Sequence, residues 1–122
     1  NLGHTFAHAY EATVGYNKGL NHGEAVLLGI SSAVEFSRQK NILNENDYQR
    51  IIKHLKKLNY YNLNKYFEYK DISNIIFYMK QDKKNKGSKI NLILLKSLAR
   101  PLLDKSFEEN KVRSFLKYLL NR

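Results

Sequence analysis

Three of the four histidines in this chain fall within residues 1–24. His4 and His8 are four residues apart, so a helix over this segment would project both imidazoles from one face, one turn apart. His22 opens the sequence His-Gly-Glu, where we expect a second helix to begin and to fold back beside the first. Catalytic zinc commonly takes neutral imidazoles plus a carboxylate and keeps one position open for water or substrate. This part of the chain is therefore the candidate metal site.

The H-x-x-x-H spacing alone has a simpler explanation, because such pairs occur by chance in helices and a half-buried histidine is usually hydrogen-bonded. The surrounding pattern is longer: it reads N-L-G-H-T-F-A-H-A-Y-E over residues 1–11, G-Y at 15–16 and H-G-E-A-V at 22–26. It resembles the C-terminal domain of the 3-dehydroquinate synthase family. The block M-K-Q-D-K-K at 79–84, Gly87 and the apolar run 90–95 are similar to a second block of that family.

Three positions depart from the family pattern. Ala7 stands where the family usually has glycine, Leu28 where a small residue is common, and Ile30 where methionine is usual. Alanine in place of glycine at a close helix contact slightly enlarges the side chain and is expected to affect packing. None of the three substitutions removes a metal ligand.

The resemblance implies a role for particular residues. His4 and His22 match the two histidine ligands of the family's catalytic zinc, and the third ligand, a glutamate, belongs to a preceding domain outside this chain. His8 matches a catalytic histidine that lies in the substrate pocket near the phosphate group. Glu11 and Glu24 are candidates to orient the imidazoles by hydrogen bonds, with solvent exposure or helix capping as the alternatives.

Substrate contacts are implied for residues at both ends of the matched region. Asn1 matches an asparagine that contacts substrate, and one of Lys83 and Lys84 matches a substrate-contacting lysine. Their spacing does not decide between the two lysines, so both are candidates. Amide and cationic groups suit a substrate that carries phosphate and carboxylate.

The resemblance also implies an activity, two cofactors and several partners. The activity is that of a phosphate-eliminating lyase, which converts 3-deoxy-D-arabino-heptulosonate 7-phosphate, a phosphorylated keto sugar acid, to 3-dehydroquinate in the shikimate route to chorismate and the aromatic amino acids. The cofactors are NAD, bound mainly by an N-terminal domain of the same protein, and a divalent metal, zinc or cobalt, which eases loss of the hydroxyl proton as hydride leaves. A homodimer is expected for the full-length protein. Residues 1–122 alone are expected to be inactive and to bind zinc weakly, because two imidazoles are too few protein ligands.

Composition agrees with one domain of a larger, cytoplasmic protein. A chain of 122 residues can bury a modest core, and the absence of cysteine excludes a disulfide framework or a cysteine-based zinc site. We find no G-x-G-x-x-G motif, which fits a nucleotide-binding domain elsewhere, and no apolar stretch of about 18 residues or signal-like start. The net charge of +10 is spread over 53–57, 80–89 and 105–122, largely opposite apolar stripes, so no nucleic-acid or membrane partner is expected.

Other functions remain open at this point. Another sugar phosphate cyclase, or an iron-type or glycerol dehydrogenase, also uses histidines on such helices; Asn1, His8 and the D-K-K block favour the synthase. A basic helical nucleic-acid-binding domain is the alternative without enzymatic activity. A metal-dependent helical phosphohydrolase is a third possibility, although its usual adjacent His-Asp pair is missing.

Periodicity predicts a mainly α fold with a small β-hairpin near residues 90–104. The resemblance implies that this is the helical C-terminal domain of the dehydroquinate synthase-like fold. Helices are expected over about 3–14, 22–41 and 45–58. A fourth is expected to follow Asp71, run through Met79 and carry Lys83 and Lys84 at its C-terminal end, and a last helix is expected to follow Ser106. Asn44 and Asp71 are the expected caps of the third and fourth helices, and Ser106 with Glu109 forms a capping box for the last. Strand 90–96 would pair with 100–104, with Pro101 at an edge. The predicted buried stripe of the third helix consists of Tyr48, Ile51, Ile52, Leu55 and Leu58.

Overall fold

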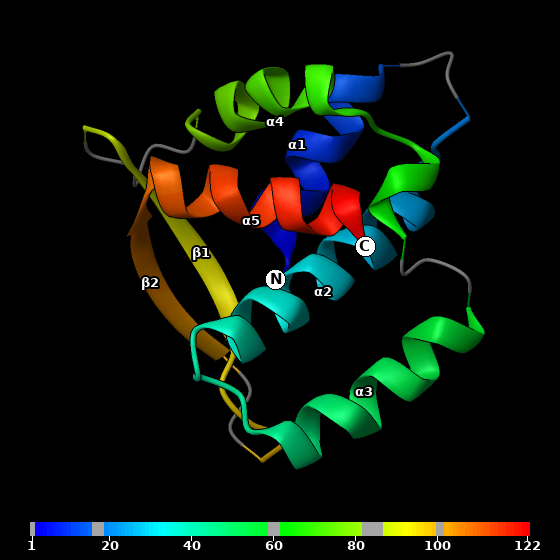
Figure 1. Cartoon of the computed structure of the whole chain (residues 1–122), viewed down its shortest axis with the longest axis vertical. Helices are drawn as coiled ribbons and strands as arrows, with labels where there is room; N and C mark the ends of the chain where they lie inside the picture. Colours follow the sequence, from blue (N-terminus) through cyan, green and yellow to red (C-terminus); the bar gives the residue numbers. More distant parts are fainter. Residues whose placement is uncertain (1, 16–18, 59–61, 82–86, 100–101) are drawn as a thin grey trace.

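The computed structural model describes residues 2–15, 19–58, 62–81, 87–99 and 102–122. This part of the chain forms five α-helices, two short 3-10 helices and one antiparallel pair of strands (Figure 1). The elements are α1 (His4–Val14), α2 (His22–Gln39), α3 (Glu45–Lys57), α4 (Ile72–Met79), β1 (Lys89–Leu95), β2 (Leu102–Glu108) and α5 (Glu109–Asn121). The predicted mainly helical fold with one hairpin is confirmed. No helix in the described ranges is long and apolar enough to cross a membrane.

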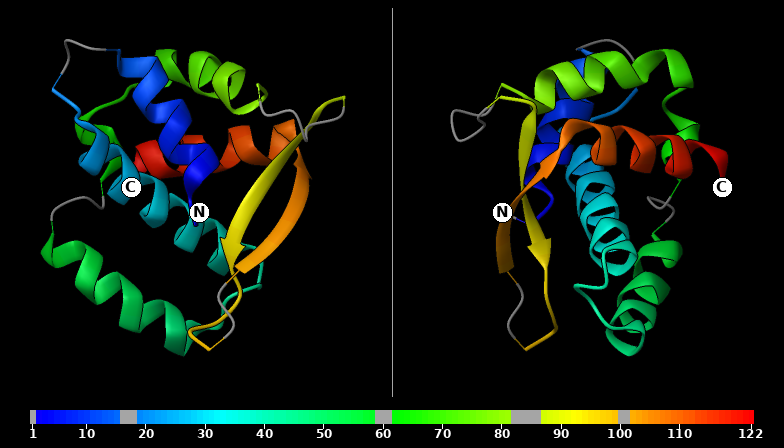
Figure 2. Two further views of the ribbon diagram at one scale, coloured as in Figure 1. Left: turned by 180° about the vertical axis from the view of Figure 1, so that it is seen from behind. Right: turned by 60° about the vertical axis from the view of Figure 1, so that its left-hand side comes forward.

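Helix α2 lies at the centre of the fold. Its residues 31–37 are all buried, including the polar Ser31, Ser32, Glu35 and Ser37. Helix α1 packs against α2 and α4, while α5 crosses the same core and the hairpin flanks one side (Figures 1 and 2). Strand β1 lies against the helices and is mostly buried, whereas β2 is the exposed outer strand. A cluster of aromatic rings fills the space between α1, α2, α5 and β2, including edge-on contacts of Phe36 with Phe107 and Phe115.

Several helix ends follow the predicted chemistry. Helix α1 ends at Gly15, whose φ of 74° places it in the left-handed region that glycine adopts without strain. The Asn44 side chain accepts the N–H of Asp47 at 2.9 Å and caps α3.

Helix α2 stops at Gln39, two residues before the predicted end. Leu58, predicted as buried, follows the end of α3 and is 51% exposed, so that prediction was wrong.

Two predicted helix caps are also wrong. The Asp71 carboxylate does not cap α4 but accepts the N–H of Glu68 at 2.8 Å, within the short 3-10 helix Tyr69–Asp71. Ser106 lies inside β2, and its hydroxyl donates to Asn91 Oδ1 across the strand pair at 3.1 Å. The strand continues to Glu108 because Phe107 pairs opposite Ile90 and packs on the core, so the second strand is longer than the predicted 100–104. Pro101 lies outside the described residues.

A buried carboxylate joins three elements and was not foreseen from the sequence. Glu35 of α2 is fully buried, and its carboxylate forms ion pairs with Arg122 Nη1 at 2.9 Å and Arg38 Nη2 at 3.2 Å. The carboxylate also accepts a hydrogen bond from the hydroxyl of Tyr48. Burial by itself would lower the pKa of Arg38, but the hydrogen bond and charge of Glu35 outweigh that effect and raise it. The network ties the C-terminal end of α2 to α3 and to the last residue of the chain.

Candidate metal and substrate site

Helix α1 presents three polar side chains on one face. His4, His8 and Glu11 are four and then three residues apart, and the two imidazole rings stack with centroids 6.1 Å apart and planes inclined by 21°. Both imidazoles are exposed, whereas the other face of the helix carries the buried Phe6, Ala9 and Tyr10. Packing of the apolar face therefore fixes the direction in which the polar face points.

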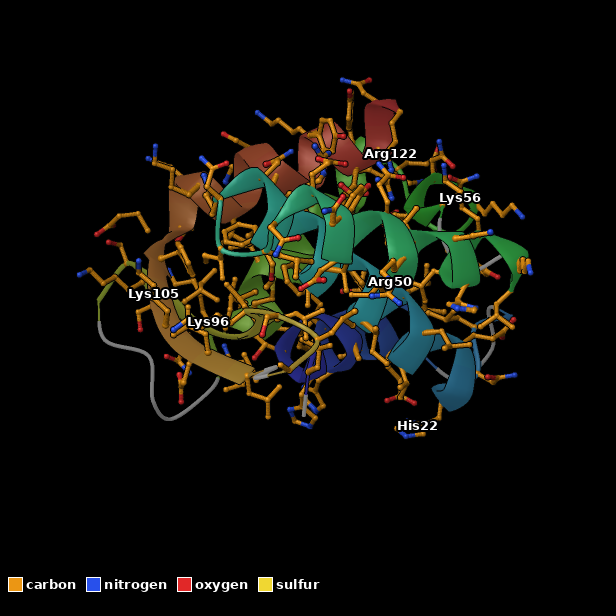
Figure 3. All side chains as sticks on the ribbon, turned by 90° about the horizontal axis from the view of Figure 1, so that it is seen from below. His22, Arg50, Lys56, Lys96, Lys105 and Arg122 are labelled. Atoms are coloured by element: carbon orange, nitrogen blue, oxygen red, sulfur yellow. The ribbon has the colours of Figure 1, made fainter. Side chains whose placement is uncertain are left out.

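His22 is the first residue of α2 and is held there by a capping box. Asn21 Oδ1 accepts the N–H of Glu24 at 2.8 Å, and Glu24 Oε1 accepts the N–H of Asn21 at 2.9 Å. Of the alternatives for Glu24, helix capping is the one observed. The imidazole of His22 is left at the edge of the molecule, beside α1, while Arg122 lies at the opposite edge (Figure 3).

Glu11 connects the two helices at this site. Its Oε1 and Oε2 lie 3.2 and 3.1 Å from Nδ1 of His22. The two side chains are 41% and 78% exposed, so the contact lies at the surface. It attaches His22 to the same helix face that carries His4 and His8.

All three histidines line one hollow at the surface, with a volume of about 500 Å³. Among the described residues, its remaining lining consists of the Glu11 carboxylate and four apolar side chains, those of Leu2, Ala7, Val26 and Ile30. A second hollow of about 570 Å³ shares His8, Glu11 and His22 and continues toward Gly15 and Leu20. The chain thus brings together His4, His8 and His22, which the sequence singled out, at one place.

Two glycines allow α1 and α2 to approach closely enough to form this hollow. A Cβ on Gly3, whose φ is +73°, would stand 2.4 Å from the carbonyl of Gly29. A Cβ on Gly29 would stand 2.6 Å from the oxygen of Gly3 and 2.7 Å from the Cβ of Ala7. The alanine at position 7 therefore fits only because position 29 has no side chain. The sequence reasoning flagged position 7 but missed Gly29, since a glycine inside a helix gives no sign of what it contacts.

Strand β1 anchors the start of α1. The N–H of Gly3 donates to the carbonyl of Ile93 at 3.4 Å, and the hydroxyl of Thr5 donates to the carbonyl of Asn91 at 3.2 Å. These contacts on both sides of His4 fix its backbone against the sheet. His4 therefore projects from a rigid position, as a precise site requires.

A buried hydrogen bond fastens α1 to α2 beneath the histidines. Tyr10 and Ser32 share a hydroxyl–hydroxyl contact of 2.6 Å, and the Ser32 hydroxyl also reaches the carbonyl of Leu28 at 2.9 Å. Burial raises the pKa of Tyr10 well above its ordinary value, although the hydrogen bond to Ser32 opposes the shift. Tyr10 is therefore a neutral structural residue.

The other predicted site residues cannot be placed at the hollow. Asn1, Lys83 and Lys84 lie outside the described residues. The prediction that the fourth helix carries the lysine pair at its C-terminal end was wrong, because α4 ends at Met79. Lys80, at the start of that block, donates to Glu109 Oε1 at 2.8 Å and fixes the end of α4 to α5. The substrate contacts of Asn1, Lys83 and Lys84 stay predictions.

The donor set fits a divalent metal that takes part of its ligands from elsewhere. His4 and His22 offer exposed imidazoles at one hollow, and the carboxylate beside His22 is the usual outer partner of a ligating histidine. In the part of the chain that the structure describes, no group of three or more His, Cys, Asp or Glu residues is arranged to hold a metal ion. A metal at this hollow therefore needs at least one further ligand.

The family model described as 3-dehydroquinate synthase C-terminal matches residues 1–85. Together with the helical fold and the histidine pattern, this match places the chain plainly: it belongs to the 3-dehydroquinate synthase C-terminal family. The resemblance seen in the sequence is thereby confirmed.

Curated relatives named 3-dehydroquinate synthase cover nearly the whole chain. The protein from Pelagibacter ubique is 46% identical over 123 residues, covering 100% of this chain and 33% of the relative. The protein from Zymomonas mobilis is 36% identical over 120 residues, covering 95% of this chain and 31% of the relative. The chain thus spans about one third of the length of these relatives.

A solved structure shares the fold. It is the crystal structure of 2-deoxy-scyllo-inosose synthase complexed with carbaglucose-6-phosphate, NAD+ and Co2+, which aligns with a TM-score of 0.75 over 95% of this chain and 33% of that chain. The sequence identity is 22%, so this similarity concerns the fold.

Proposed function

We propose that this chain is the helical C-terminal domain, residues 1–122, of a cytoplasmic 3-dehydroquinate synthase and supplies two of its metal ligands. The full-length protein would convert 3-deoxy-D-arabino-heptulosonate 7-phosphate to 3-dehydroquinate and phosphate. One observation carries the proposal: His4, His8 and His22 line a single hollow in a chain that belongs to this family.

Each histidine has a distinct task in this proposal. His4 and His22 hold a divalent metal, zinc or cobalt, and the preceding domain supplies a further ligand and binds NAD. When bound, the metal eases loss of a substrate hydroxyl proton while hydride passes to NAD. His8, whose ring stacks on that of His4, holds or moves a proton at the phosphate of the substrate. Asn1 and one of Lys83 and Lys84 contact the anionic groups of the substrate.

The test is turnover by the full-length protein, measured as phosphate release with NAD and with zinc or cobalt. We expect activity that a chelator removes and either metal restores. His8→Ala is expected to lower turnover by about 10²–10⁴-fold, the usual contribution of a proton-transferring group. His22→Ala is expected to lose bound metal, measured by elemental analysis. His54, exposed on α3 and away from the hollow, provides the matched control: His54→Ala should retain metal and turnover.

Another sugar phosphate cyclase is the second candidate, favoured by the fold shared with 2-deoxy-scyllo-inosose synthase. A parallel assay with a six-carbon sugar phosphate separates the two activities. Release of phosphate from that substrate, but not from the heptulosonate phosphate, would replace the first proposal. An iron-type or glycerol dehydrogenase would instead reduce NAD without releasing phosphate. The proposed homodimer is tested by the molar mass of the full-length protein in solution.

A further inference from the structure

We propose that Glu11 is a positioning residue, which holds the ring of His22 so that Nδ1 carries the hydrogen and Nε2 is the nitrogen offered to a metal. This inference rests on the proposed function only where it invokes the metal. The role assigned to Glu11 is to act through the ring of His22.

Hydrogen-bond chemistry fixes the tautomer. An ionised carboxylate can only accept, so with both oxygens of Glu11 at 3.1–3.2 Å the hydrogen belongs on Nδ1 of His22. A neutral imidazole then has its lone pair on Nε2, the form in which histidine ligates metals. Among the residues that the structure describes, Nε2 of His22 makes no hydrogen bond, so it is free for a ligand.

Glu11 is the carboxylate available for this task. It lines both hollows beside His22, and among the residues that the structure describes it is the only acidic one in either lining. Glu24, the other acidic residue near the start of α2, is committed to the backbone of Asn21. Glu11 also stands on the helix that carries His4, so its contact fixes the position of one candidate ligand relative to the other.

A plain surface ion pair would look similar but would behave differently. Exposed pairs contribute little to stability, and both partners here are exposed by more than one third. Loss of Glu11 should therefore barely change the thermal unfolding temperature. If Glu11 positions His22, its loss should instead change the tautomer of the ring and the metal affinity.

The experiment uses the full-length protein with Glu11→Ala, Glu11→Gln and the control Glu24→Gln. In the metal-free protein at about pH 8, where imidazoles are neutral, long-range ¹H–¹⁵N correlation spectra report which nitrogen of His22 carries the hydrogen. The His22 signals are assigned by their loss in His22→Ala. We expect hydrogen on Nδ1 in the wild type and in Glu24→Gln, a mixture of tautomers in Glu11→Ala, and a largely retained Nδ1 hydrogen in Glu11→Gln, whose amide oxygen still accepts.

Zinc affinity, measured by competition with a chromophoric chelator, is the second readout. Glu11→Ala should bind zinc about 10–100-fold more weakly, as is usual for loss of a partner of a ligating histidine. Glu11→Gln should lie between Glu11→Ala and the wild type, and Glu24→Gln should match the wild type. An unchanged tautomer in Glu11→Ala would overturn the inference, and so would unchanged zinc affinity. A wild-type protein that binds no divalent metal would refute the proposed function, while the tautomer comparison would still decide the role of Glu11.

Discussion

Replacing Gly29 by alanine tests the contact that sets the distance between α1 and α2. The new Cβ would lie 2.6 Å from the carbonyl oxygen of Gly3 and 2.7 and 2.8 Å from Cβ and N of Ala7. Ordinary contact begins at 3.4 Å, so the two helices would have to move apart by about 0.8 Å. Two of the three contacted atoms belong to the backbone, so rotation of a side chain cannot relieve the clash.

The expected cost follows from two opposing effects. Overpacking of a close contact costs about 1–3 kcal/mol, and the backbone contacts place this case near the upper limit. Alanine in the interior of a helix is better than glycine by about 1 kcal/mol. Gly29→Ala should therefore lower the free energy of unfolding by about 2 kcal/mol. A displacement of this size between His4 and His22 should also reduce turnover by about 100-fold.

The assay is denaturant unfolding of the full-length protein together with hydrogen exchange of the amides in α1 and α2. Gly23→Ala is the matched control, because it makes the same change in the same helix. Among the described residues, its Cβ would meet only Asn21 Oδ1, at 3.5 Å. Its stability should stay within about 0.5 kcal/mol of the wild type. Unchanged stability and unchanged protection in Gly29→Ala would refute the tight crossing.

Three further outcomes are expected. Arg122→Ala should cost about 3 kcal/mol in denaturant unfolding, because it removes one partner of the fully buried Glu35; a loss below about 1 kcal/mol would mean that Arg38 and Tyr48 suffice. Glu109→Gln should flatten the pH dependence of the free energy of unfolding. The hydrogen bond from Lys80, and then that from Arg113, lowers the pKa of Glu109. The ionised carboxylate therefore stabilises the fold above about pH 4.5, and this contribution is lost as the pH falls through the lowered pKa. Stability that falls equally in both proteins on acidification would contradict this. Residues 1–122 produced alone should bind zinc weakly in isothermal titration, and tight one-to-one binding would contradict the need for an outside ligand.

The helices were predictable because their signals are local. The apolar periodicity around Phe6 and Tyr10, the glycine after α1 and the asparagine before α3 each act within a few residues, and the structure places the helices where they indicate. Clustering near the start of the chain singled out the three histidines that share the hollow, and the family resemblance gave each of them a role. Their spacing on α1 was sufficient only to place two of them on one helix face.

The predictions failed where distant residues decide the local structure. Ser106 has the spacing of a helix cap, but strand pairing with Asn91 and the burial of Phe107 extend β2 through it. Asp71 is an exception, because the N–H that its carboxylate accepts belongs to Glu68, only three residues away. The burial of Glu35 depends on Arg122, 87 positions along the chain, and the importance of Gly29 depends on Gly3. None of these relations leaves a periodic signal in the sequence.

The division of candidate ligands has a practical consequence for whoever purifies this protein. Since the described residues supply imidazoles but no complete set of donors, an ion at the hollow must be shared with another part of the molecule. One metal ion per chain would then indicate that both parts have folded and are in contact. Truncated or misassembled molecules, purified in the presence of cobalt, would lack the colour of bound cobalt. The molar ratio of metal to protein in a preparation would thus give the fraction of correctly assembled molecules before any substrate is added.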